Sequence, residues 1–337
     1  MAVKKIGRQT VKLQNPPSVL AYASVVGPKE GEGPLKEYFD QILQDDYVGE
    51  NSWEKAECKI LQQAIMLAMQ KAKITVGDVD YLLAGDLLNQ IISSSFTARQ
   101  YQIPYIGLYG ACSTMSESLS LGALLIDGGF ADYVIAATSS HFSSAERQYR
   151  FPLELGTQRP LTAQWTVTGA GATVLCSTGD GPYITYVTTG RVMDLGIKDA
   201  NNMGAAMAPA AVDTIKAHFS DTGFGPKDYD LIITGDLAKV GKELTLELLK
   251  KDGIDISEIY TDCGIEIYDC EKQDTHAGGS GCGCSAAVLN GYIFTEMKKG
   301  TFKRVLFMAT GALLSPTSSQ QGESIPGIAH AVTIEMG

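Results

Sequence analysis

Basic residues, paired cysteine motifs and long apolar runs are all scarce in this 337-residue sequence. Lysine and arginine number 27 against 38 aspartate and glutamate residues, which gives a net charge of −11 at pH 7. A chain this acidic lacks the basic face that a nucleic-acid-binding protein needs, so we expect no nucleic-acid partner. An anionic small molecule would have to meet a local group of cations.

Membrane-spanning and secretory patterns are missing as well. The apolar run 305–314 (VLFMATGALL) falls well short of the roughly 20 residues that a spanning helix needs. The basic start, residues 1–17, lacks the apolar core of a signal peptide, so we expect neither a signal peptide nor a transmembrane segment. Seven cysteines, an odd number with no CxxC spacing, favour a reducing cytoplasm over a disulfide framework.

The chain repeats itself at a shift of about 150 to 170 residues. Residues 78–87 (DVDYLLAGDL) and 228–237 (DYDLIITGDL) are identical at five of ten positions. A second pair follows in the same order, 129–138 and 300–309, each a glycine turn that leads into an apolar strand. Helical patterns alternate with these strands, which predicts buried parallel sheets. We therefore predict an α/β fold of two duplicated halves, residues 1–180 and 181–337.

Four segments together resemble the thiolase and β-ketoacyl synthase III family. The segment 110–139, which begins GACS, is similar to the nucleophile segment of the synthases, and 165–175 (WTVTGAGATVL) to their glycine-rich strand. The segment 201–215 resembles the entry to the second half of thiolases, and 275–289 (THAGGSGCGCSAAVL) their histidine loop. The resemblance implies a five-layer α-β-α-β-α arrangement and a homodimer, and we expect no cofactor.

Cys112 and His276 match the family's catalytic positions in this resemblance. A helix N-terminus can lower the pKa of a thiol, so Cys112 would be a thiolate that attacks a thioester, and His276 its base or oxyanion donor. The alternative is that Cys112 is a buried core residue and His276 a hydrogen-bonded loop residue. With the motif match, we expect both side chains to line one pocket.

The match to a catalyst is incomplete. Ala309 or Thr310 stands where thiolases carry a second cysteine, and 279–281 (Gly-Ser-Gly) where the synthases carry an asparagine. The synthase histidine motif is replaced by 260–263 (Tyr-Thr-Asp-Cys). We therefore expect a binding protein on an enzyme scaffold, with an acyltransferase that uses Cys112 as the alternative.

Over its whole length the chain also resembles the stage V sporulation protein AD family of spore-forming bacteria. This resemblance implies binding of dipicolinic acid (pyridine-2,6-dicarboxylate), alone or with calcium, and a part in its uptake into the developing spore. It further implies membrane-protein partners of the same operon, and a place on the cytoplasmic side, peripheral to the inner spore membrane. The ligand-binding residues that we expect are Cys112, His276, Gly279, Gly281, Thr310, Ser139, Arg147, Arg150 and Asp86.

Several of these residues also have a purely structural interpretation. Asp86 and Asp236 follow the repeated strands and would cap the next helices, although Asp86 could also reach the pocket. A cluster of four cysteines and His276 (Cys263, Cys270, Cys282, Cys284) fits no familiar zinc spacing, so we expect packing and no metal. Ser139 and His141 follow a strand and form a loop pair.

An arginine-rich segment, 146–160 (ERQYRFPLELGTQRP), is the one local source of cations near the expected pocket. Arg147, Arg150 and Arg159 lie beside Tyr149 and Phe151, and arginine pairs bidentately with carboxylates. These arginines would clamp a dicarboxylate whose ring stacks on an aromatic side chain. The alternative is that they pair with Glu146 and Glu154 on a solvated surface.

Overall fold

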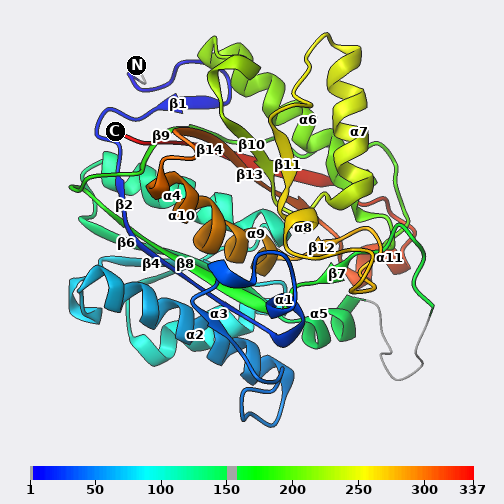
Figure 1. Cartoon of the computed structure of the whole chain (residues 1–337), viewed down its shortest axis with the longest axis horizontal. Helices are drawn as coiled ribbons and strands as arrows, with labels where there is room; N and C mark the ends of the chain where they lie inside the picture. The colour runs from blue at the N-terminus through cyan, green and yellow to red at the C-terminus, as the bar shows by residue number, and fades with distance from the viewer. Residues whose placement is uncertain (1–2, 150–157) are drawn as a thin grey trace.

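A 12-stranded sheet forms the centre of the protein (Figure 1). Ten of its strands form two five-stranded halves with the same order, an N-terminal and a C-terminal sheet, which a single residue pair joins. The computed structural model describes residues 3–149 and 158–337. The N-terminal sheet has the order β5 (Tyr105–Gly107), β4 (Tyr81–Gly85), β6 (Tyr133–Ser140), β8 (Gly169–Cys176), β2 (Ser18–Val26). The C-terminal sheet has the order β11 (Tyr260–Asp262), β10 (Leu231–Thr234), β13 (Arg304–Ala312), β14 (Gly327–Glu335), β9 (Tyr183–Thr188).

The sequence repeats occupy equivalent strands in the two sheets. The first pair provides β4 and β10, and the second provides β6 and β13. The duplication predicted from the sequence is thus confirmed. The boundary at residue 180 stays a prediction; β2 and β9 meet near it, where Ser18 pairs with Tyr183.

Only part of each sheet is parallel. Strands β4, β5 and β6 pair in parallel, as do β10, β11 and β13. The other pairs are antiparallel: β8 pairs with β6 and β2 in the N-terminal sheet, and β14 pairs with β13 and β9 in the C-terminal sheet. The expectation of wholly parallel sheets is therefore wrong, because buried strands read as continuous apolar runs whatever their direction.

Helices cover both sheets and fill the space between them (Figure 1). Helices α2 (Trp53–Ala72) and α3 (Ile92–Tyr101) cover the outer side of the N-terminal sheet, and α6 (Met203–Thr222) and α7 (Ala238–Lys251) that of the C-terminal sheet. The middle layer contains α4 (Thr114–Asp127), α9 (Cys282–Val288) and α10 (Phe294–Lys299). Their arrangement completes the predicted five layers.

The remaining elements are short: two are strands that pair with β9 and β2 in the main sheet, and the others are helices. They are β1 (Thr10–Lys12), β3 (Gln41–Ile42), α1 (Pro28–Gly31), α5 (Phe142–Tyr149), α8 (Cys263–Glu266) and α11 (Pro316–Gln320). A two-stranded ladder matters most for the site: β7 (Trp165–Thr166) pairs with β12 (Gly279–Ser280) and so joins the two halves. It brings the loop before α9 close to the start of α4.

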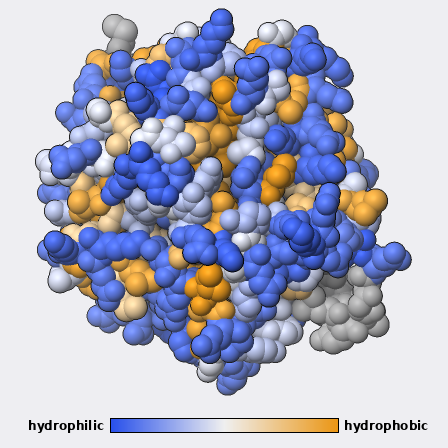
Figure 2. Space-filling model, viewed as in Figure 1, coloured by the Kyte–Doolittle hydropathy of each residue, from blue (hydrophilic) through white to orange (hydrophobic). Residues whose placement is uncertain are grey.

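The surface in view shows no feature that identifies a binding site. On the face in Figure 2, hydrophobic residues lie in small groups among hydrophilic ones, which is usual and marks no binding face by itself. Across residues 3–149 and 158–337, every helix is too short or too polar to cross a bilayer.

Candidate functional site

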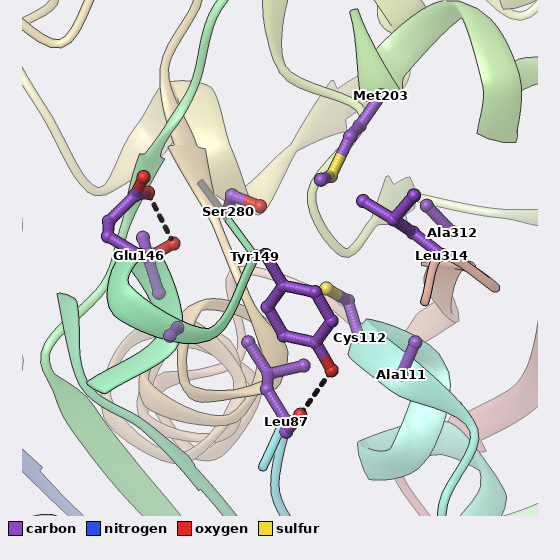
Figure 3. A pocket seen from close by; sticks show the side chains of 11 residues that line it. Leu87, Ala111, Cys112, Glu146, Tyr149, Met203, Ser280, Ala312 and Leu314 are labelled. Carbon is purple, nitrogen blue, oxygen red and sulfur yellow. Dashed lines mark hydrogen bonds between the residues drawn. The ribbon is translucent and has the colours of Figure 1, made fainter. Parts of the chain in front are cut away.

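A small cavity lies between the two halves at the N-terminal end of α4 (Figure 3). Its volume is about 40 Å³, enough for a few water molecules. Both halves contribute to the lining, which consists of Leu87, Ala111, Cys112, Ala145, Glu146, Tyr149, Thr166, Met203, Ser280, Ala312 and Leu314. Most of these side chains are apolar, and Glu146 is the one charged residue among those described.

Cys112 reaches this cavity from a tight turn. Residues Ala111–Ser113 form one 3-10 turn before α4, in which Ser113 Oγ donates to the Gly110 carbonyl at 2.7 Å. Thr114 Oγ1 donates to the Ala111 carbonyl at 2.6 Å, which fixes the same turn from its other end. The Cys112 side chain is buried, packed with Leu87, Ala145 and Cys282, and Tyr149 packs against this group.

The partner of the Cys112 thiol is Asp236, which follows β10. Burial raises the pKa of Cys112 well above its usual range, and the Asp236 carboxylate raises it further. The expectation that the helix start lowers this pKa is therefore wrong. The amide of Gly281 acts in the opposite direction, but burial and the carboxylate outweigh it. The thiol is held neutral.

Asp236 joins three segments of the C-terminal half. Its carboxylate accepts hydrogen bonds from the Gly281 amide at 2.9 Å, from Ser280 Oγ at 3.3 Å and from Thr310 Oγ1 at 2.8 Å. Burial raises the pKa of Asp236 to about 6, although these hydrogen bonds favour the ionised form. Gly281 and Thr310 thus bind Asp236, and Ser280 faces both Asp236 and the cavity.

Gly281 is required at its position by the backbone. Its φ is +100°, and a Cβ atom there would lie 2.7 Å from Ser140 Oγ. Gly279, two residues earlier, belongs to β12 and accepts a hydrogen bond at its carbonyl from Gln164 Nε2 at 3.3 Å. Both predicted glycines therefore shape the loop, and neither lines the cavity.

His276 lies outside the cavity lining. Its Nδ1 is 2.8 Å from the Pro160 carbonyl, and its Nε2 is 3.0 Å from Asp274 Oδ1. The expectation that His276 and Cys112 line one pocket is therefore wrong for this cavity. The loop turns at His276 itself, whose φ is +55°, and this turn directs the ring towards Pro160 and Asp274.

Asp86 is a helix cap, as its structural interpretation predicted. Its carboxylate accepts the amides of Leu88 at 2.9 Å and Ser94 at 2.8 Å, the latter in the first turn of α3. Asp236 does not play this part for α7, because Asp262 accepts the amides of Leu237 and Ala238 instead. The capping prediction is thus confirmed for Asp86 and wrong for Asp236.

Ser139 and Thr310 are buried next to carboxylates. Ser139 Oγ donates to Glu57 Oε1 at 3.1 Å, and its carbonyl accepts from the Cys282 thiol at 3.0 Å. Neither Ser139 nor Thr310 lines the cavity. In the described part of the chain, no group of three or more Cys, His, Asp and Glu side chains could hold a metal ion.

The arginines are engaged elsewhere. Arg147 pairs with Glu54 of α2 and lies over the Trp53 ring, 5.3 Å from its centroid. Arg159 contacts Asp274 and lies 4.7 Å from the centroid of the Trp165 ring. Arg150, with Phe151 and Glu154, lies outside the described residues. Arg147 and Arg159 therefore have protein partners, which are not the acidic residues expected from the sequence.

Some cavity residues were not expected from the sequence. Glu146 accepts a hydrogen bond from Thr166 Oγ1 at 3.3 Å, and Tyr149 donates to the Leu87 carbonyl (Figure 3). Met203 and Leu314 come from the other half of the chain. Leu87 was the one of these residues that the sequence pointed to, because it ends the first copy of the repeated Gly-Asp-Leu, directly after strand β4.

Comparison with known proteins gives consistent results. The family model of stage V sporulation protein AD matches residues 7–335. The chain is 47% identical over 333 residues to stage V sporulation protein AD of Bacillus subtilis (strain 168), covering 99% of this chain and 98% of that protein.

Solved structures of two enzyme groups share the fold. The 3-oxoacyl-[acyl-carrier-protein] synthase III of Aquifex aeolicus VF5 matches with a TM-score of 0.59 and 14% identity, over 95% of this chain and 99% of that one. The human mitochondrial 3-ketoacyl-CoA thiolase matches with a TM-score of 0.58 and 14% identity, over 97% and 99%. These identities establish a thiolase-like fold alone. The family match and the full-length relative go further, and the chain belongs to the stage V sporulation protein AD family.

Proposed function

We propose that this sporulation protein is a non-catalytic binding protein for dipicolinic acid or its calcium chelate, and that it takes part in uptake of this compound into the developing spore. The observation that carries the non-catalytic part is the burial of the Cys112 thiol near the Asp236 carboxylate, both of which raise the pKa of the thiol. The ligand comes from the family resemblance.

The alternative, an acyltransferase, requires a thiolate at Cys112 and a group that moves protons. A nearby carboxylate disfavours the thiolate, since two negative charges would share a buried site. No imidazole lines the cavity among the residues described, and His276 has other partners. Condensation chemistry would thus lack both its nucleophile and its base.

The charge of the cavity supports the calcium chelate over the free dianion as its ligand. Glu146 lines the cavity and Asp236 lies directly behind it, so a dianion would face two carboxylates. Calcium prefers carboxylate oxygens as ligands, and its chelate with dipicolinate carries no net charge. Because 40 Å³ is too small for a pyridine ring, binding requires side chains such as Met203 to change rotamer.

Calorimetry with dipicolinate tests this proposal. We expect saturable binding in the presence of equimolar calcium, and we expect Glu146→Gln to weaken it about tenfold, because a carboxylate ligand of the ion is lost. Glu247→Gln, which removes an exposed carboxylate on α7, is the matched control and should change nothing. Saturable binding of neither the calcium chelate nor the free acid, or binding that Glu146→Gln leaves unchanged, would overturn the proposal.

Thiol chemistry provides the second test. Incubation with acetyl-CoA should leave Cys112 unmodified, and iodoacetamide should alkylate it slowly at pH 7.5, because the neutral thiol is a poor nucleophile. Asp236→Asn should speed this alkylation, since it removes the neighbouring negative charge. Stable acylation of Cys112 by acetyl-CoA, lost in Cys112→Ala, would establish the acyltransferase instead.

The partners and the location are part of the same proposal. We propose that the protein acts as a homodimer on the cytoplasmic side of the inner spore membrane, held there by membrane proteins of its operon. The family resemblance supports this arrangement.

A further inference from the structure

A second cavity, which shares no lining residue with the Cys112 cavity, lies between β2, α2 and α10. Its volume is about 230 Å³, several times that of the Cys112 cavity. Tyr22 of β2 forms one wall, and Lys71 of α2 and Lys298 of α10 stand at its rim. The Tyr22 ring packs against Phe294, with the two centroids 5.1 Å apart, so its position is fixed.

Two ammonium groups converge on the Tyr22 ring. Lys71 Nζ is 5.4 Å and Lys298 Nζ is 5.2 Å from its centroid, from helices that belong to different halves of the chain. The Lys298 side chain is exposed to solvent, although partial desolvation of its ammonium group and the charge of Lys71 both lower its pKa. Like charges brought together in this way are destabilising unless an anion lies between them.

The positive charge of Lys71 is balanced by a carboxylate, whereas that of Lys298 has no such partner among the described residues. Lys71 Nζ donates to Asp40 Oδ1 at 2.5 Å and to the Tyr22 carbonyl at 2.9 Å. For Lys298, residues 3–149 and 158–337 supply neither a hydrogen-bond acceptor nor an ion-pair partner, only the Tyr22 ring. The three charged residues of the cavity therefore leave one positive charge unbalanced, in a chain whose net charge is −11.

The backbone beneath the cavity is irregular. The helix from α9 to α10 contains a π-helical turn, Leu289–Ile293, of a kind that is frequent at functional sites. This turn places Asn290 in the cavity lining, fully buried, where Thr173 Oγ1 donates to its Oδ1 at 2.7 Å. Thr295, one turn before Lys298 on the same face of α10, adds a hydroxyl.

We propose that this cavity is a binding site for a small oxyanion, a carboxylate or a phosphate, whose charge is met by Lys298. The site lies apart from the Cys112 cavity and does not depend on the function proposed for it. Because dipicolinate carries two carboxylates, its calcium-free form is one ligand that the site would take, and inorganic phosphate is another.

Calorimetry in calcium-free buffer that contains EDTA tests the proposal, with dipicolinate and inorganic phosphate as separate probes. We expect at least one of them to bind, and Lys298→Gln to weaken that binding about tenfold or more, since a charge-assisted hydrogen bond is lost. Lys216→Gln, which removes an exposed lysine of α6 paired with Asp252, is the charge-matched control and should leave binding unchanged. The relative affinity of the two probes tells a carboxylate site from a phosphate site.

Thermal unfolding supplies a second readout. The bound anion should raise the Tm of the wild-type protein and not that of Lys298→Gln, whose own Tm without ligand should be no lower than that of the wild type. Binding that Lys298→Gln leaves intact, or no binding of either probe, would overturn this inference. Neither result would touch the proposed function, which depends on the calcium chelate and on Glu146.

Discussion

Asp236→Ala is expected to lower the free energy of unfolding by about 3 to 5 kcal/mol. The substitution leaves the Gly281 amide and the Thr310 hydroxyl without their acceptor in the protein interior. Buried donors without acceptors each cost about 1 to 3 kcal/mol, and the lost side chain also leaves a void. Because Asp236 joins β10, β13 and the loop before α9, the effect should extend to the Cys112 cavity.

Urea denaturation measures this change, with Asp180→Ala as the control. Asp180 is exposed and forms no side-chain hydrogen bond or ion pair in the described structure, so its replacement should change stability by less than about 0.5 kcal/mol. Asp236→Asn keeps the volume of the side chain but turns an amide NH₂ towards hydrogen-bond donors. Its loss of stability should therefore lie between those of Asp236→Ala and Asp180→Ala. An Asp236→Ala protein as stable as the wild type would contradict the assignment of Asp236 as the centre of this network.

The second large effect concerns pH. Burial raises the pKa of Glu30 and Asp262 to about 7 and that of Asp86 and Asp236 to about 6. Each of these groups binds a proton more tightly in the folded protein than in the unfolded chain. Their contribution to stability is therefore complete below about pH 4 and is lost as the pH rises through 6 to 7.

Three histidines act in the opposite direction, and burial lowers the pKa of one of them, His141, below its usual value. Burial lowers the pKa of His218 and His330 to about 4, so their contribution is lost as the pH falls from about 6.5 to 4. The four carboxyls outweigh them, and we expect the free energy of unfolding to be about 2 to 4 kcal/mol higher at pH 5.5 than at pH 8.

Denaturant titrations at a series of pH values measure this difference. Asp262→Asn should flatten the curve between about pH 4 and 7, because in this range the Asp262 carboxyl is protonated in the folded protein and ionised in the unfolded chain. Asp180→Asn again serves as the exposed control. A stability that rises steadily from pH 5.5 to pH 8 would show that these carboxyls are ionised without cost.

The surroundings of Cys112, and not its place at the start of a helix, determine the pKa of its thiol. Cys112 stands at the start of α4, as the family pattern predicted, yet its pKa is raised. A helix start favours a thiolate only when the surroundings are polar or positive, and here Asp236 and burial decide the balance. Burial and one carboxylate from a distant part of the chain thus keep the Cys112 thiol in its protonated form.

The sequence alone was enough to predict the duplicated α/β fold, the strands that repeat and the position of Cys112. These features depend on local patterns: apolar runs, glycine turns and motif spacing survive in the order of the residues. Asp86 as a helix cap belongs to the same class, because the cap and its helix are neighbours in the chain.

Only the tertiary structure decided which side chains meet. Asp236 lies 124 positions from Cys112 in the sequence, yet the two are neighbours in the fold. His276 is only a few residues from the loop 279–281, but its ring turns towards the Pro160 carbonyl. The identical Gly-Asp-Leu of the two repeats predicted that Asp86 and Asp236 would both cap the helix that follows. In the second half Asp262 accepts the amides at the start of α7, which leaves Asp236 free to bind other groups. A residue's partner depends on backbone positions far apart in the chain, and no local pattern records them.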